Sequence, residues 1–133
     1  MSALATVEIK AFVPARDFAL AIRFYQDLGF TKASEGHGVA YFYCGDCSFL
    51  LQPFEQPGFA ENFVMHLLVP DVQAWWQHVA QADIAGRYQV PVGAVKDQPW
   101  GMREFVLHDP SGVMWRIAQN LGPPVAHAAN AAS

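Results

Sequence analysis

Two cysteines lie three positions apart in the segment Cys44-Gly45-Asp46-Cys47, which has the spacing of a redox or zinc-binding pair. The Gly-Asp dipeptide between them predicts a β-hairpin turn. No second cysteine pair is present to complete a tetrahedral zinc site. A redox cysteine usually lies at a helix N-terminus, where the helix dipole lowers its pKa. We therefore interpret this pair as part of a hairpin without redox or metal chemistry.

His66 is a candidate ligand contact, because an imidazole can form hydrogen bonds with a ligand and act as an acid or base near neutral pH. A histidine held by hydrogen bonds within the fold is the structural alternative. The sequence fixes no cysteine, serine or carboxylate beside it, so we assign no catalytic residue. The positions predicted for His37, His78 and His108 are a loop, a helix flank and a strand end, where solvent exposure explains each of them.

Trp100 stands between Pro99 and Gly101 in an otherwise polar loop and has no periodic place in a core. It is a candidate for contact with a ligand or with a second subunit. Four further aromatic residues border the predicted hairpin and linker: Tyr41, Tyr43, Phe54 and Phe59. Packing explains each of them singly, but as a group they suggest a surface on which flat heteroaromatic rings could stack. Three tryptophans fall on helical or strand stripes and are assigned to the core or an interface: Trp75, Trp76 and Trp115.

The first half of the chain is predicted to form a βαβββ unit. Apolar and polar residues alternate over residues 7–13, which indicates a half-buried strand that ends at Pro14. A helical stripe follows from Asp17, and Gly29 provides a C-cap for this helix. Three further strands are predicted at residues 30–34, 39–44 and 48–53.

The same order of elements returns after a linker at residues 54–62. A strand is predicted at residues 63–69, a helix from Val72, and a weak strand at residues 88–95. Two last strands, at residues 102–108 and 113–120, flank a strong turn signal at residues 109–112. One such unit cannot cover its own sheet, so two units are expected to combine.

The expected fold class is therefore α+β. Two βαβββ modules, at about 6–53 and 63–120, would form a curved mixed sheet around a cleft, with the helices on the outer face. We expect a single domain over residues 1–121 and a disordered tail over residues 122–133.

Composition and charge exclude several classes of partner. The chain has 133 residues, a formal net charge of −4 and eight scattered Lys and Arg residues, which does not favour nucleic-acid binding. The apolar stretches are shorter than the roughly 18 residues that cross a membrane, so no membrane partner is expected. Two cysteines make no disulfide framework, and a reducing cytoplasm is the expected location.

Three stretches resemble the vicinal-oxygen-chelate superfamily, which contains glyoxalase I, extradiol dioxygenases and the bleomycin-resistance proteins. They are Val13-Pro14-Ala15-Arg16-Asp17 through Phe24-Tyr25 to Leu28-Gly29-Phe30, Leu68 to Val72, and Gln98-Pro99-Trp100-Gly101 through Arg103-Glu104-Phe105 to Asp109-Pro110-Ser111-Gly112. The third stretch is most similar to the bleomycin-resistance branch.

The resemblance implies four positions on the cleft face where metal-using relatives place His, Gln or Glu. They correspond here to Lys10, Leu51, Val64 and Arg116. Leucine and valine have no lone pair, arginine stays protonated, and lysine would have to lose its proton before it could bind a metal. The expected protein therefore uses no metal and no cofactor.

The resemblance also implies a function, namely a homodimer whose cleft sequesters an aromatic and cationic small molecule such as an antibiotic. The expected ligand contacts are Trp100, His66, Arg116, Lys10, Tyr41, Tyr43, Phe54, Phe59 and Glu104. Three acids would attract the positive charge of the ligand: Glu61, Asp97 and Glu104. Lys10 and Arg116 in the same cleft would instead favour an anion, unless Glu8 or another acid neutralises them.

Two other functions stay open. One is a metal-dependent enzyme of the glyoxalase or dioxygenase type, with an unrecognised set of metal ligands that includes His66. The other is a carrier or immunity-like protein whose surface binds another protein.

Overall fold

The computed structural model describes residues 4–54 and 56–122, and these divide into two compact units. Unit 1 extends to Phe63 and includes Pro110–Val113, and unit 2 comprises Val64–Asp109 and the chain from Met114 onward. The tail predicted at residues 122–133 lies outside the described residues except for Gly122. No helix within the described ranges is long and apolar enough to cross a membrane.

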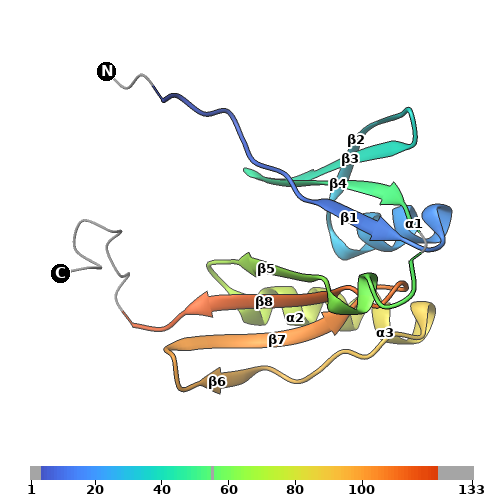
Figure 1. Ribbon diagram of the computed structural model, residues 1–133. Coiled ribbons are helices and arrows are strands. Elements are labelled where there is room, and N and C mark those ends of the chain that lie inside the picture. Colours follow the sequence, from blue (N-terminus) through green and yellow to red (C-terminus); the bar gives the residue numbers. More distant parts are fainter. Residues whose placement is uncertain (1–3, 55, 123–133) are drawn as a thin grey trace. The chain divides into compact units, whose positions relative to one another are not determined.

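Unit 1 is a four-stranded mixed sheet with one α-helix (Figure 1). Its elements are β1 (Phe12–Ala15), α1 (Phe18–Leu28), β2 (Thr31–Gly36), β3 (Val39–Cys44), β4 (Cys47–Pro53) and the 3-10 helix η1 (Ala60–Asn62). The strand order is β1-β4-β3-β2, in which β1 runs parallel to β4 and the other pairs are antiparallel.

The helix α1 begins after Asp17 and ends at the C-cap Gly29, as the sequence predicts, and the structure adds Asp17 as its N-cap. The Asp17 carboxylate accepts a hydrogen bond from the backbone N–H of Leu20 at 3.1 Å, and Gly29 ends the helix with φ 126°. The helix packs against β2 and β4. Its Tyr25 ring forms the centre of an aromatic core with Phe24, Phe30, Phe42 and Phe49.

The first strand is shorter than its alternating sequence predicts. It begins at Phe12, the register partner of Leu50 on β4, whereas residues 7–11 form no regular strand although β4 continues back to Cys47. Pro14 was expected to end the strand but lies inside β1. An edge strand that pairs only with β4 tolerates a residue without a backbone N–H.

Unit 2 has the same strand arrangement, with the order β5-β8-β7-β6 (Figure 1). Its elements are β5 (Val64–Leu68), α2 (Val72–Gln81), α3 (Ile84–Tyr88), β6 (Lys96–Gln98), β7 (Met102–His108) and β8 (Met114–Asn120). Together the two units confirm the α+β class with two modules of the βαβββ type, the second with an extra helix.

The weak strand predicted at residues 88–95 is wrong. This part of the chain finishes α3 and then forms only an isolated bridge between Val92 and Leu107 before β6 begins. Pro91 has no N–H to donate to a ladder, and Gln89 adopts φ 56°, so the segment cannot continue as a regular strand.

Candidate functional site

Alternate residues of β8 point to opposite faces of the unit 2 sheet. The Gln119 side chain accepts a hydrogen bond from the backbone N–H of Val72 at 2.9 Å, so it lies on the face that α2 covers. By the two-residue period of a strand, Arg116, Ala118 and Asn120 lie on the opposite face. We call this second face the open face of unit 2.

Arg116 is held in place on the open face by an acid and an aromatic ring. Its Nη2 donates a hydrogen bond to Glu104 Oε2 at 2.6 Å, and this carboxylate raises the pKa of the Arg116 guanidinium. The guanidinium carbon lies 5.6 Å from the centre of the Trp100 ring, within the range of a cation–π contact. Glu104 is only 3% exposed, whereas Trp100 is 57% exposed. Three predicted contacts therefore form one cluster, which we call the Trp100 cluster.

Two atoms of the Trp100 cluster have hydrogen-bonding capacity left over. Glu104 Oε1 and Arg116 Nε are buried and make no hydrogen bond to the described protein. One is an acceptor and the other a donor, and the two side chains that carry them are already joined through Glu104 Oε2.

His66 lies beside the Trp100 cluster. It is the register partner of Arg116 on the neighbouring strand β5, so both side chains extend from the same face of the sheet. His66 is exposed, as is Val64 two residues earlier on the same face. The predicted neighbourhood of His66 and Arg116 is thus present in unit 2.

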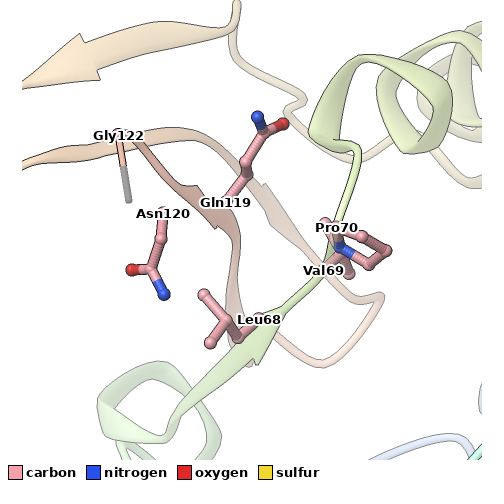
Figure 2. A pocket seen from close by; sticks show the side chains of 6 residues that line it. All are labelled: Leu68, Val69, Pro70, Gln119, Asn120 and Gly122. Atoms are coloured by element: carbon pink, nitrogen blue, oxygen red, sulfur yellow. The ribbon is translucent and has the colours of Figure 1, made fainter. Parts of the chain in front are cut away.

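A pocket of about 310 Å³ opens where β5 and β8 end, near the Trp100 turn (Figure 2). Leu68 and Asn120 point to one side of the two strands, and Gln119 points away toward the start of α2 (Figure 2). The next residue, Leu121, donates its backbone N–H to the carbonyl of Gly101 at 2.9 Å, which ties the end of β8 to the turn that carries Trp100. This volume is at the lower end of small-molecule pockets.

Unit 1 carries a polar cluster around Glu8. The Glu8 carboxylate accepts hydrogen bonds from the Tyr41 hydroxyl, at 3.1 and 3.2 Å, and from the Ser48 hydroxyl. Lys10 lies 3.1 Å from Glu8 and 5.3 Å from the centre of the Tyr41 ring. Tyr43, two residues from Tyr41, extends from the same face of β3 and is partly exposed. The structure thus brings Lys10, Tyr41 and Tyr43 together.

The hydrogen bond from Ser48, followed by that from Lys10, lowers the pKa of the Glu8 carboxyl group. An acid with a lowered pKa stabilises the fold above its unfolded pKa of about 4.3, and this contribution disappears as the pH falls through the folded value. We expect Glu8→Gln to be less stable than the original chain at pH 7, and the difference to disappear only as the pH falls below the lowered pKa that Glu8 has in the folded chain. Chemical denaturation across this range measures the difference, and a gap that persists at acid pH would contradict the assignment to charge.

Phe54 and Phe59 form a separate aromatic group in unit 1. Their ring centres are 5.0 Å apart, and Phe63 continues the group at 5.8 Å from Phe59. Phe54, but not Phe59, also lines a pocket of about 260 Å³, whose other lining residues are Arg16, Gln56, Pro57, Gly58, Ala60 and Glu61. The two phenylalanines are therefore neighbours of each other, in a different part of unit 1 from β3.

The three acids expected to attract a cation are each paired with an arginine. Glu104 bonds to Arg116, Asp97 bonds to Arg103 at 2.6 Å, and Glu61 lies 3.5 Å from Arg16. The hydrogen bond from Arg103 lowers the pKa of Asp97. Because each acid already has a positive partner, its attraction for a charged ligand is largely cancelled.

Of the four positions that correspond to metal ligands, Leu51 was placed on the wrong face. It is fully buried opposite Val13 and Ala40, on the face of the unit 1 sheet that also carries Phe49 of the aromatic core. The other three positions hold Lys10, Val64 and Arg116, of which the two cations are ion-paired. Within residues 4–54 and 56–122, no three His, Cys, Asp or Glu side chains gather into a metal-binding group. These residues do not fit the metal of the metal-using relatives.

Sequence reasoning missed two parts of the site. It named Glu8 only as a possible neutraliser of Lys10 and Arg116, and it did not single out Ser48. Glu8 precedes Tyr41 by 33 positions and Ser48 by 40 positions, so only the folded chain brings the three side chains together. It also missed Leu68 and Asn120, which line the pocket of Figure 2. The signal that could have found them is the parallel pair β5 and β8, since ligands often bind at the carboxyl ends of adjacent parallel strands.

Three solved structures of bleomycin-resistance or bleomycin-binding proteins are similar to this chain. The crystal structure of a bleomycin resistance determinant encoded on the transposon Tn5 matches with a TM-score of 0.73 and 25% identity, covering 86% of this chain and 98% of that one. A bleomycin-binding protein complexed with bleomycin matches at 0.72 and 26%, covering 86% and 99%. The bleomycin-binding protein of Streptomyces verticillus, complexed with copper(II)-bleomycin, matches at 0.69 and 25%, covering 90% and 100%.

No curated protein matches this sequence. The model of the Glyoxalase/Bleomycin resistance protein/Dioxygenase superfamily matches residues 6–117, which is most of the chain. The chain therefore belongs to the Glyoxalase/Bleomycin resistance protein/Dioxygenase superfamily.

Proposed function

We propose that this chain is a binding protein that sequesters an aromatic small molecule, such as a bleomycin-like antibiotic, and does so without a metal. The observation that carries the proposal is the Trp100 cluster. A large aromatic ring that is 57% exposed is nevertheless held over a guanidinium, which a buried carboxylate holds in turn. Such a ring is oriented before a ligand arrives, so stacking costs little conformational entropy.

The similarity to bleomycin-binding proteins supports this choice within the superfamily. Two of the matched structures contain bleomycin or copper(II)-bleomycin, and they are 26% and 25% identical to this chain over nearly their whole length. The metal-binding positions of the superfamily hold Lys10, Val64 and Arg116, which disfavours the metal-dependent enzyme as the alternative. We place the protein in the cytoplasm, where it would meet a compound that has entered the cell.

Ion pairing of the acids changes the expected basis of affinity. With Glu61, Asp97 and Glu104 each beside an arginine, stacking and hydrogen bonding would dominate over attraction to a ligand charge. The exposed Trp100 ring favours a planar aromatic ligand that stacks on it. The affinity for such a ligand would depend only weakly on salt.

A thermal-shift titration with bleomycin and with simpler planar heteroaromatic amides tests the proposal. A ligand that binds only the folded chain raises the stability by RT ln(1 + [L]/Kd), so the shift should grow with ligand concentration and hold at high salt. Elemental analysis of the same sample is the second measurement. A stoichiometric transition metal whose removal destabilises the protein, with no shift from any aromatic compound, would favour the metal-dependent enzyme instead.

The segment before β1 supports the homodimer that we include in the proposal. Residues 4–11 leave the unit 1 sheet as an extended segment without regular secondary structure (Figure 1). Val7 is 98% exposed and Ile9 is 94% exposed, although their alternation with Glu8 and Lys10 is that of a half-buried strand. A second copy of the chain would cover this apolar edge and complete the strand.

We expect the double substitution Val7→Asp and Ile9→Asp to convert the dimer to a monomer, because two carboxylates would have to be buried in the contact. Sedimentation velocity over a range of concentrations measures the change. Ala33→Asp, on the exposed part of β2, adds a charge at a position outside the segment and should leave the dimer intact. A monomeric original chain, or an unchanged dimer in the double variant, would count against this contact.

A further inference from the structure

The tip of the β3–β4 hairpin brings together two free cysteines that the proposed binding function does not use. Cys44 ends β3, Cys47 begins β4, and the two are direct register partners across the antiparallel pair. Register partners extend their side chains from the same face of a sheet. The sequence predicts the hairpin and assigns the pair no redox chemistry, but the register places the two side chains next to each other on one face, which is the arrangement that a disulfide needs.

The spacing of such a pair suits a disulfide bond. Directly opposed residues of an antiparallel pair have Cα atoms about 4.5 to 5.5 Å apart, and disulfides span Cα distances of about 4.4 to 6.8 Å. The turn between the cysteines has open space around its glycine. Gly45 supplies its positive φ of 58°, and a side chain added there would meet no atom within 4 Å.

The two thiols differ in their surroundings, which gives them different roles. Cys47 is exposed to solvent, and Cys44 is partly buried. Burial raises the pKa of the Cys44 thiol, and the neighbouring Cys47 raises it further. Because the thiolate is the reactive form, Cys47 is the thiol that an oxidant in solution would reach first.

We propose that Cys44 and Cys47 are an oxidation site that closes into an intramolecular disulfide with a hydroperoxide as oxidant. The Cys47 thiolate attacks the peroxide oxygen, the O–O bond breaks, and Cys47 becomes a sulfenic acid while hydroxide leaves and takes a proton to form water. The Cys44 sulfur then attacks the Cys47 sulfur, the S–O bond breaks, and a second water leaves. Two thiols and one hydrogen peroxide thus give one disulfide and two waters.

The disulfide would link the two strands that carry part of the polar cluster around Glu8. Tyr41 and Tyr43 lie on β3, and Ser48 lies on β4 next to Cys47. Closing the tip would hold these strands together and restrict their motion. The inference does not depend on the proposed ligand, because it concerns only the hairpin.

Hydrogen peroxide treatment of the purified chain, followed by alkylation and intact-mass measurement, tests the proposal. We expect both thiols to become inaccessible together, with the loss of two hydrogen atoms, no covalent dimer, and full recovery with dithiothreitol. In Cys44→Ser the oxidation should stop at a Cys47 sulfenic acid that dimedone captures, whereas Cys47→Ser should react several-fold more slowly. Independent oxidation of the two cysteines to sulfinic acids, or disulfides only between chains, would overturn the proposal.

Discussion

Replacement of Trp100 by alanine is expected to weaken binding of an aromatic ligand about 30-fold, which corresponds to about 2 kcal/mol. The loss combines the apolar area that the indole buries with its stacking on the ligand ring. The folded chain itself should change by less than about 0.5 kcal/mol, because the side chain is 57% exposed. Isothermal titration calorimetry with the best ligand from the thermal-shift titration measures the first effect, and chemical denaturation measures the second.

Two matched variants at the same position separate stacking from burial. Trp100→Phe keeps an aromatic face and should retain most of the affinity, whereas Trp100→Leu keeps apolar volume without a π-system and should resemble alanine. If all three variants bound the ligand as tightly as the original chain, Trp100 would not contact the ligand. An equal loss in phenylalanine and leucine would show that the size of the indole matters and its stacking does not.

Arg116→Ala is expected to destabilise the fold by about 3 to 5 kcal/mol, because it leaves the carboxylate of Glu104 buried without a partner. Glu104→Ala should lower the free energy of unfolding by clearly less than Arg116→Ala does. The side chain of Arg116 is 35% exposed and can turn its charge to solvent when the carboxylate is removed. The free energy of unfolding from urea titrations of the two variants gives this difference directly.

A double variant and an exposed ion pair serve as controls for this asymmetry. Replacing both partners with apolar side chains, Glu104→Leu with Arg116→Met, removes the stranded charge and should recover most of the stability. Arg103→Ala breaks the pair with Asp97 on the same sheet, where both side chains reach solvent, and should have a much smaller effect. If Glu104→Ala proved the more costly of the two single changes, burial of the carboxylate would not be the reason for the asymmetry.

The local signals of the sequence were sufficient for the helix caps and most strands. The helix α1 begins after Asp17 and ends at its C-cap Gly29 as predicted, since a helix end depends on hydrogen bonds and backbone angles within a few residues. The prediction of a weak strand at residues 88–95 was wrong, because Pro91 and the positive φ of Gln89 prevent a regular ladder of strand hydrogen bonds there. Local patterns therefore predict an element well only where no backbone restriction competes with them.

The sequence also supplied the types of residue at the candidate site but not their partners. It singled out Trp100, Arg116 and Glu104 separately, from a loop and from positions on two strands. Only the register of β7 with β8 and the return of the Trp100 turn toward β8 show that an acid, a cation and a ring form one cluster. Glu104 was expected to attract the positive charge of a ligand, but its ion pair with Arg116 leaves it no free negative charge.

The position of Leu51 is a second feature that the sequence could not predict. Alignment by turns placed it on the face that relatives use for a metal, and the structure places it in the core, one residue out of phase. By itself the sequence determined the fold class, the superfamily and the absence of metal-binding side chains at Lys10, Val64 and Arg116. The tertiary structure decided which charges are paired and which rings are exposed, because these depend on contacts between strands far apart in the chain.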